Sequence, residues 1–383
     1  MTRRATGGAG PTRTRFATAD VMRRRSSDPP STPAVPPPPC RGARRRATPN
    51  LPLTRAAPRR LAGALACVAA GVGLALPTAC APAARLRSAP VASAAAAGPA
   101  RARSVVIVSV DGLRPDAIAR FRADAMQGLM REGRWSLDAR TILPSKTLPS
   151  HTSMLTGVPP DRHGITWNDD AVVGRGLVPV PTVFGVARQH GLHTAAFFGK
   201  AKFRHLMVPG TLDYAQAPTG WWGRWSARRT AYDVRAYLER TARAGGPPHL
   251  LFVHLGEPDY AGHAVGWMSW LYGRAVRTAD EALAVVLAAA DAAYGRGGYT
   301  LILTADHGGH RRTHGSADSL DVTIPWVAWG QSVVPGPALG SGIRTMDTGA
   351  TALWLLGVPV PPAWVGRPVA AAFRAPGAPA EAR

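Results

Sequence analysis

The chain has 383 residues and a formal net charge of +23, yet residues 1–103 hold 18 of its 46 Lys and Arg residues and only 2 of its 23 acidic residues. The arginines of this basic tail are interleaved with Pro, Ala and Ser and not with stacking aromatic residues, so the composition argues against a nucleic-acid-binding protein. The three cysteines, at positions 40, 67 and 80, exclude a disulfide framework or a thiolate metal site in the rest of the chain.

Three segments precede the predicted globular domain. Residues 1–53 are rich in Arg, Pro and Ala and show no helical or strand period, so we predict a disordered tail. Residues 54–81 contain an apolar run, and residues 82–103 form an Ala/Pro/Arg linker. The globular domain is expected to cover residues 104–383, which is long enough to bury a core without disulfides.

The segment 54–81 has the features of an export signal. Arg59 and Arg60 precede the apolar run 61–76, and the small-residue triplet Ala79-Cys80-Ala81 follows. A cleaved secretory signal peptide explains all three features. Alternatives are a lipoprotein signal that ends at Cys80 and an uncleaved membrane anchor, which is short for a span. We therefore expect a periplasmic, secreted or membrane-anchored protein. Because the signal lies far from Met1, we also expect the physiological start to lie downstream.

The domain alternates strand-like and helix-like stretches. Continuous apolar runs predict strands over residues 104–110, 193–198, 249–255, 299–304 and 323–329. Amphipathic stretches predict helices over residues 115–131, 181–190, 226–243, 267–293 and 347–356. This alternation predicts an α/β fold in which helices cover both faces of a mostly parallel central sheet.

Acidic residues follow three of the predicted strands. Asp111 comes directly after the first strand, Asp259 follows residues 249–255, and Asp306 follows residues 299–304. Ligands bind beyond the carboxyl ends of parallel strands, so these side chains are expected at one site. Asp259 taken alone could also be a helix cap.

The stretch 301–315, LILTADHGGHRRTHG, adds three histidines within a few residues of Asp306: His307, His310 and His314. Carboxylate and imidazole groups are the ligands that suit Zn²⁺ where thiolates are absent. A solvated polar loop is the alternative, but the Gly308-Gly309 pair favours a close approach of the backbone to a ligand. His263 stands four residues after Asp259, which places both on one side of a helical turn.

Five motifs occur in the order seen in the alkaline phosphatase superfamily. They are Asp111, the KTLPS segment around Thr147, HGITWN ending in Asn168, the PDxxGH segment, and DHGG followed by HG. Residues 104–357 most resemble the type I phosphodiesterase/nucleotide pyrophosphatase branch of this superfamily. The resemblance implies a dizinc enzyme that cleaves phosphodiester or nucleotide pyrophosphate bonds through a covalent phospho-threonine, although another divalent metal is possible.

The resemblance also assigns roles to individual residues. It implies that Thr147 is the nucleophile and a metal ligand, and that Asn168 hydrogen-bonds a phosphoryl oxygen. Ser145 and Ser150 are rival hydroxyls by residue type, and Thr147 could instead be a helix cap. The implied ligands of one zinc are Asp259, His263 and His314, and those of the other are Asp111, Asp306 and His307. A threonine cannot become formylglycine, which argues against sulfate esters.

Lys200 and Lys202 depart from the pattern of the phosphodiesterase branch. They resemble the Lys-x-Arg pair of monoesterases with a threonine nucleophile, so we predict that they bind substrate and offset the extra negative charge of a phosphomonoester. Solvated loop lysines are the alternative. The leading function is therefore phosphodiester or pyrophosphate hydrolysis, the second phosphomonoester hydrolysis, and an inactive surface binding protein is a third.

Five tryptophans form the other group of interest. They either line a pocket for a flat leaving group or pack in the interior. They are Trp221, Trp222, Trp225, Trp267 and Trp270. We expect a small phosphate ester or nucleotide as substrate and no specific nucleic-acid binding, with a possible membrane or lipid tether through the N-terminal segment.

Overall fold

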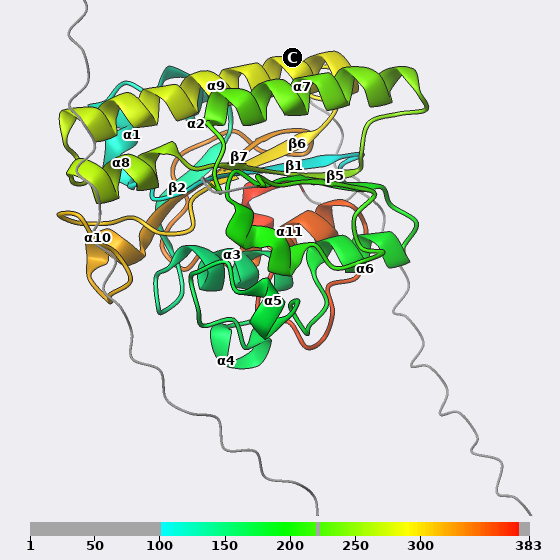
Figure 1. The fold of residues 1–383 in the computed structure, drawn as a ribbon. Helices are drawn as coiled ribbons and strands as arrows, with labels where there is room; N and C mark the ends of the chain where they lie inside the picture. Colours follow the sequence, from blue (N-terminus) through cyan, green and yellow to red (C-terminus); the bar gives the residue numbers. More distant parts are fainter. Residues whose placement is uncertain (1–100, 220–222, 375–383) are drawn as a thin grey trace, which may run out of the picture. The chain divides into compact units, whose positions relative to one another are not determined.

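The computed structural model describes residues 101–219 and 223–374 (Figure 1). Its centre is a seven-stranded sheet in the order β2-β7-β6-β1-β5-β3-β4. The strands are β1 (Val105–Val110), β2 (Arg134–Arg140), β3 (Thr194–Phe197), β4 (Tyr214–Gln216), β5 (Leu250–Leu255), β6 (Thr300–Thr304) and β7 (Thr323–Gly330). Parallel pairing joins β6, β1, β5, β3 and β4, whereas β7 runs antiparallel to both β6 and β2. The predicted α/β fold with a mostly parallel sheet is confirmed.

Helices cover both faces of this sheet. Figure 1 shows α7 and α9 side by side over one face and α3, α6 and α11 over the other. The α-helices are α1 (Pro115–Arg120), α2 (Asp124–Glu132), α3 (Thr147–Thr156), α4 (Pro160–His163), α5 (Val172–Arg175), α6 (Val183–Gln189), α7 (Ala227–Arg243), α8 (Glu257–Val265), α9 (Trp270–Tyr294), α10 (Ser319–Val322) and α11 (Asp347–Leu355). Two 3₁₀ segments are η1 (Ala201–Leu206) and η2 (Ala370–Ala372).

The central strands are apolar because both of their faces are covered. Every residue of β1, β5 and β6 is buried. A parallel strand between two helical layers must bury its side chains on both sides, which explains the continuous Val, Ile and Leu runs. These three strands lie next to one another in the order β6-β1-β5, so their carboxyl ends share one edge of the sheet.

The single helix predicted over residues 115–131 is wrong. The chain forms α1 and α2 there, and Arg122, with φ of 55°, separates them. The amino end of α2 is stabilised from another helix, because the Asp280 carboxylate of α9 accepts hydrogen bonds from the backbone N–H groups of Ala125 and Met126 at 3.0 and 2.9 Å. The long helix α9 begins at Trp270 and not at position 267, because Ser269 caps it by accepting from Tyr272 N at 3.2 Å.

The amino end of the domain includes the last residues of the predicted linker. Ala102 is 2% exposed, and the backbone N–H groups of Arg101 and Ala102 both donate to the carbonyl of Leu355. The predicted tail, export signal and most of the linker lie outside the described residues, as do all three cysteines. None of the described helices combines the length and the apolar character that a membrane span requires.

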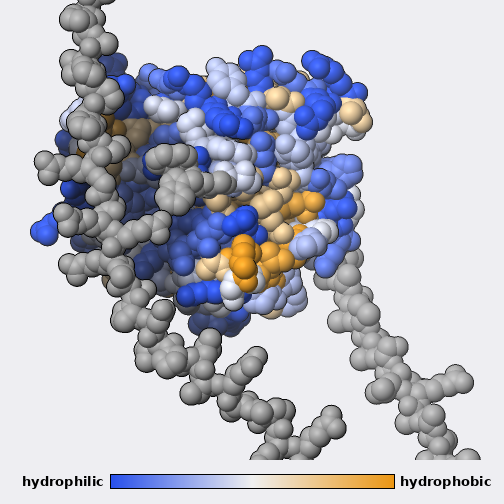
Figure 2. Space-filling model, in the orientation of Figure 1, coloured by the Kyte–Doolittle hydropathy of each residue, from blue (hydrophilic) through white to orange (hydrophobic). Residues whose placement is uncertain are grey.

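One face of the molecule has an apolar area near α5. Figure 2 shows this area at the position that α5 has in Figure 1, and Val173 of α5 is 96% exposed. This helix packs against η1, which carries Lys202. An exposed apolar side chain therefore lies near one of the two predicted substrate-binding lysines.

Candidate metal centre

Three neighbouring strands deliver the acidic residues to one place. Asp111 follows β1, Asp306 follows β6, and Asp259 lies in the first turn of α8 directly after β5. The backbone joins two of them, since Asp259 N donates to the carbonyl of Asp111 at 3.0 Å. The strands β6, β1 and β5 are neighbours in the sheet, so the ends of these parallel strands bring the three carboxylates together, as expected.

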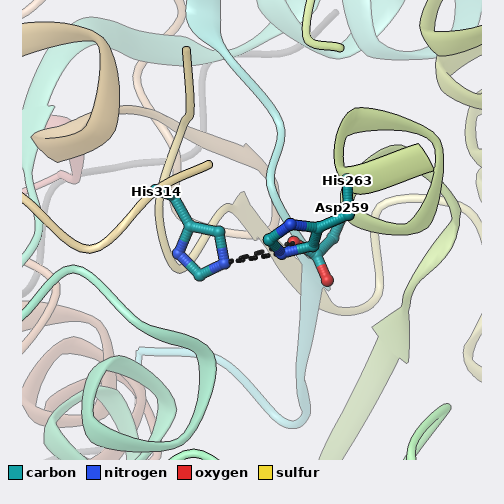
Figure 3. Close-up of side chains that lie close together, drawn as sticks. All are labelled: Asp259, His263 and His314. Atoms are coloured by element: carbon teal, nitrogen blue, oxygen red, sulfur yellow. Dashed lines mark hydrogen bonds and ion pairs between the residues drawn. The ribbon is translucent and has the colours of Figure 1, made fainter. Parts of the chain in front are cut away.

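The first group of donors consists of Asp259, His263 and His314, whose ligand atoms lie within 4.8 Å of one another (Figure 3). The two Nε2 atoms of His263 and His314 lie 3.3 and 3.5 Å from Oδ1 of Asp259. Asp259 and His263 share one side of α8 through their spacing of four residues, as predicted. His314 reaches them from the loop after β6.

Backbone carbonyls orient both imidazoles of this group. His263 Nδ1 donates to the carbonyl of Arg312 at 3.1 Å, and His314 Nδ1 donates to that of Ser145 at 2.8 Å. The proton of each neutral ring is therefore on Nδ1, and Nε2 carries the lone pair that binds metals. Burial lowers the pKa of His314 to about 3, with His307 adding to the effect, so this imidazole is neutral.

The second group consists of Asp111, Asp306 and His307, all fully buried. His307 Nε2 lies 3.5 Å from Oδ1 of Asp111 and 3.2 Å from Oδ2 of Asp306. Its Nδ1 donates to the carbonyl of Gly308 at 2.8 Å, so Nε2 again carries the lone pair. Burial, followed by the nearby Asp111 carboxylate, raises the pKa of Asp306 to about 7.

One oxygen of each aspartate is buried without a hydrogen-bond partner among the described residues: Oδ1 of Asp111, Oδ1 of Asp259 and Oδ2 of Asp306. A buried carboxylate oxygen is costly unless it is paired or coordinates a metal. The unpaired oxygens are also the ones nearest the imidazole Nε2 atoms. The donor set of oxygen and nitrogen atoms fits two divalent cations, and it suits Zn²⁺.

Gly112 locks the three strand ends together. Its φ is 70°, and a Cβ there would lie 3.0 Å from Cα of Asp259, so only glycine fits this position. Its N–H donates to Oδ1 of Asp306 at 3.1 Å, which leaves Oδ2 of Asp306 for a metal. Its carbonyl accepts from Trp267 Nε1 at 3.0 Å and from Tyr272 Oη at 2.9 Å.

Thr147 is the first residue of α3 and is fully buried. Its hydroxyl lies 3.5 Å from His307 Nε2, beside the second group of donors. The next residue, Leu148, donates its backbone N–H to Oδ1 of Asn168 at 3.0 Å. Because Lys202 Nζ also donates to this Oδ1 at 3.0 Å, the NH₂ of Asn168 is the part of the amide that can donate to an anion.

The rival hydroxyls serve structural contacts. Ser145 Oγ donates to the carbonyl of Ser316 at 2.8 Å, and Ser150 Oγ lies 2.7 Å from Oγ1 of Thr141. The extra histidine His310 donates from Nδ1 to the buried Asp321 at 2.7 Å and belongs to neither group of donors.

Comparison with known protein families identifies the family of this chain. The family model described as "Type I phosphodiesterase / nucleotide pyrophosphatase" matches residues 105–325. The chain belongs to this family. The resemblance deduced from the five sequence motifs is thereby confirmed.

Two curated proteins are similar to parts of this chain. Bis(5'-adenosyl)-triphosphatase enpp4 of Xenopus laevis is 34% identical over 64 residues, 17% of this chain and 14% of that protein. GPI ethanolamine phosphate transferase 1 of Aspergillus oryzae is 26% identical over 237 residues, 56% of this chain and 22% of that protein. The matched regions thus span less than a quarter of the length of these two relatives.

A solved structure shows the same fold. Murine ectonucleotide pyrophosphatase/phosphodiesterase 5, an inactive variant with a threonine changed to alanine and bound to AMP, aligns with a TM-score of 0.58 at 16% identity. The alignment covers 68% of this chain and 96% of that chain.

The two lysines, Lys200 and Lys202, have different surroundings. Lys200 Nζ lies 2.7 Å from Oδ2 of Asp111 and 2.6 Å from Oδ2 of Asp259. Burial favours the neutral amine, but these two carboxylates outweigh it and raise the pKa of Lys200. Lys202 contacts the carbonyl and side chain of Asn168, and burial, followed by Lys200, lowers its pKa to about 8.

Two buried histidines next to the metal centre were missed from the sequence. His254, in β5, accepts from Gly199 N on Nδ1 at 3.2 Å, so its Nε2–H donates to Oδ2 of Asp111 at 2.8 Å. His151, in α3, donates from Nδ1 to the carbonyl of Thr147 at 2.9 Å and accepts from Ser109 Oγ at 2.8 Å. The only signal for His254 is a single histidine in the otherwise apolar run LLFVHL.

The described tryptophans differ in their surroundings. Trp267 is 7% exposed, and its ring lies 5.2 Å from that of His263, so it packs against the metal centre. Trp270 is 68% exposed, and the guanidinium of Arg229 lies 4.7 Å above the ring of Trp225. Trp221 and Trp222 lie outside the described residues.

Proposed function

We propose that this protein is a metal-dependent phosphoric-ester hydrolase that cleaves phosphodiester or nucleotide pyrophosphate bonds through a covalent intermediate on Thr147. The observation that carries the proposal is the buried Thr147 hydroxyl, which stands at a helix amino terminus 3.5 Å from His307, a donor of the second metal group. Two groups of three metal donors converge at the same edge of the sheet. Two divalent cations held there, most plausibly Zn²⁺, would supply positive charge for the attacking and leaving oxygens.

The chain's own residues have separate tasks in this scheme. The Thr147 hydroxyl gives up its proton to solvent as its oxygen forms a bond to phosphorus. The bond from phosphorus to the leaving oxygen breaks, and that oxygen departs with the bonding electrons and is protonated by solvent. Water then attacks the phospho-threonine and releases the threonine hydroxyl. Throughout, the NH₂ of Asn168 donates a hydrogen bond to a phosphoryl oxygen. This role is supported by the orientation of the amide, because its Oδ1 already accepts hydrogen bonds from Leu148 N and Lys202 Nζ.

Two properties of the relatives support the proposal. The murine structure is described as an inactive variant in which a threonine is changed to alanine, and it holds AMP. The frog relative is named for the cleavage of a dinucleoside triphosphate. A nucleotide or another small phosphate ester is therefore the substrate class that we propose for this chain.

Phosphomonoester hydrolysis is a second candidate, favoured by one observation. Lys202 Nζ lies 3.0 Å from Oδ1 of Asn168, so a cation stands beside the amide proposed to bind phosphoryl oxygen. A phosphomonoester carries about one more negative charge than a diester, and a nearby ammonium stabilises it.

The test compares bis-(4-nitrophenyl) phosphate with 4-nitrophenyl phosphate as substrates for the zinc-loaded protein. Thr147→Ala is expected to abolish hydrolysis of both while the zinc content stays at the wild-type level. Ser150→Ala, a neighbouring buried hydroxyl in the same helix, is the matched control and is expected to retain most activity. Wild-type turnover in Thr147→Ala would contradict the assignment of the nucleophile.

We also propose that the protein is exported, on the basis of the signal-like segment 54–81. Amino-terminal sequencing of the protein recovered from the periplasm, membrane and medium tests this proposal. A mature protein that begins after residue 79 supports a cleaved signal or a lipidated Cys80, and mass spectrometry of the first residue distinguishes the two.

A further inference from the structure

The Lys200 side chain reaches into the metal centre. It is 5% exposed, and its ammonium lies 2.7 Å from Asp111 and 2.6 Å from Asp259. These two aspartates belong to different groups of donors. Lys200 therefore contacts both groups of donors.

In both carboxylates, one oxygen contacts Lys200 and the other does not. Each gives Oδ2 to Lys200 and keeps Oδ1 free of hydrogen bonds within the described part of the chain. The free Oδ1 of Asp259 lies 3.3 Å from His263 Nε2, and that of Asp111 lies 3.5 Å from His307 Nε2. The lysine thus contacts the other oxygen of each carboxylate and leaves these two oxygens for metal ions.

The backbone on either side of Lys200 is held firmly. Gly199 N–H donates to His254, which itself donates to Asp111, and a Cβ at Gly199 would lie 2.9 Å from His254 Nδ1. Lys200 also forms an isolated antiparallel bridge with Arg224. The position of the ammonium is therefore fixed by the fold and not by a flexible loop.

We propose that Lys200 is a positioning residue of the metal centre, a permanent counter-ion whose ammonium bridges Asp111 and Asp259 and keeps their free oxygens directed at the histidines. The inference rests on the proposed metal centre, and it gives Lys200 a different role from the substrate contact expected from sequence. Two buried carboxylates that lie close together repel each other, and removal of the cation that pairs with a buried charge is strongly destabilising.

The first test needs no metal and no substrate. The full-length wild type, Lys200→Met, Asp259→Asn and the double variant are treated with a chelator, and their melting temperatures are compared. Lys200→Met is expected to lower the melting temperature by roughly 10 °C, because it leaves two buried carboxylates without their cation. The double variant is expected to recover much of this loss, since one negative charge is removed together with the positive one.

Failure to fold is also informative in this design. If Lys200→Met does not fold without metal, the double variant and Lys200→Arg, which keeps the positive charge, are expected to fold. A double variant that is no more stable than Lys200→Met would overturn the proposal, as would a Lys200→Met protein with the wild-type melting temperature.

A second arm adds ZnCl₂ to the same proteins. The zinc-induced rise in melting temperature is expected to be larger in Lys200→Met than in the wild type, because bound zinc replaces the missing positive charge. Lys202→Met is the matched control: its ammonium contacts Asn168 and no metal donor, so its response to zinc should equal that of the wild type.

The two arms separate the possible failures. If zinc leaves the wild-type melting temperature unchanged, the proposed metal centre is wrong, while the metal-free comparison still decides the role of Lys200. If Lys200→Met keeps the wild-type stability and zinc response but loses phosphomonoester hydrolysis, Lys200 acts on the substrate and the inference is overturned.

Discussion

Nε2 of His263 and Nε2 of His314 lie 3.0 Å apart, and each ring has its Nδ1 proton committed to a backbone carbonyl. Two lone pairs at this distance repel each other unless a cation lies between or beside them. In the metal-free protein a proton can take that place, and the Asp259 carboxylate, 3.3 Å from Nε2 of His263, accordingly raises the pKa of His263. A metal ion that binds both nitrogens and Asp259 removes the conflict.

His314→Ala is therefore expected to lose one of the two metal ions that we propose for the wild type. The change removes one donor of the first group and leaves the second group of Asp111, Asp306 and His307 complete. Elemental analysis after dialysis against zinc measures the metal content per chain. His310→Ala is the control, because His310 bonds Asp321 and belongs to neither group. Equal metal content in both variants would contradict the assignment of His314.

His254→Leu is expected to weaken metal binding at the second group by about 10- to 100-fold, because the Nε2–H bond that orients Asp111 is lost. His254→Gln offers an amide donor at a similar reach and should restore part of the affinity. Competition with a fluorescent zinc chelator measures both. Wild-type affinity in His254→Leu would mean that Lys200 alone is enough to orient Asp111.

The preference for monoesters is expected to fall as the pH rises through about 8. Burial and Lys200 lower the pKa of Lys202 to about 8, so its ammonium is charged below that pH and is lost above it. The ratio of the kcat/KM values for 4-nitrophenyl phosphate and bis-(4-nitrophenyl) phosphate, measured from pH 6 to pH 10, follows this change. In Lys202→Arg, whose side chain stays charged, the ratio should not vary over this range. If the ratio in Lys202→Arg still falls with pH as it does in the wild type, another group is responsible.

Asp280→Ala is expected to destabilise the fold by about 1–2 kcal/mol and to leave the activity of the folded enzyme unchanged. The Asp280 carboxylate accepts the N–H groups of Ala125 and Met126 at the start of α2, remote in sequence from the metal donors. Chemical denaturation measures the loss. Asp280→Asn keeps an oxygen acceptor and should be less affected.

The sequence was sufficient to predict the central sheet and the convergence of the metal donors. The strands β1, β5 and β6 are continuous apolar runs, and the acids that follow them must meet once the strands are parallel neighbours. The edge strand β2 is harder to predict: it is only partly buried and carries Arg134, Asp138 and Arg140, so it shows no clear apolar alternation. The break between α1 and α2 was also missed, since Arg122 gives no local signal for a positive φ.

Contacts that depend on packing could not be read from the sequence. His254 stands among apolar residues in β5, and its role depends on Gly199 and Asp111, which are remote from it in the chain. The position of Lys200 between two carboxylates likewise follows from the pairing of β3 with β5 and of β5 with β1. The sequence shows which side chains are present at these positions, but their contact partners follow only from the packing of the fold.

The interlocked backbone at Gly112 limits how this centre can be transferred to another protein. Gly112 holds Asp306 through its N–H and two aromatic side chains through its carbonyl, and a Cβ in its place would crowd the backbone of Asp259. A design that copied only the ligand side chains onto a new scaffold would lack these main-chain restraints. Engineers who wish to reuse the chemistry would need to transplant the three strand ends as one rigid piece.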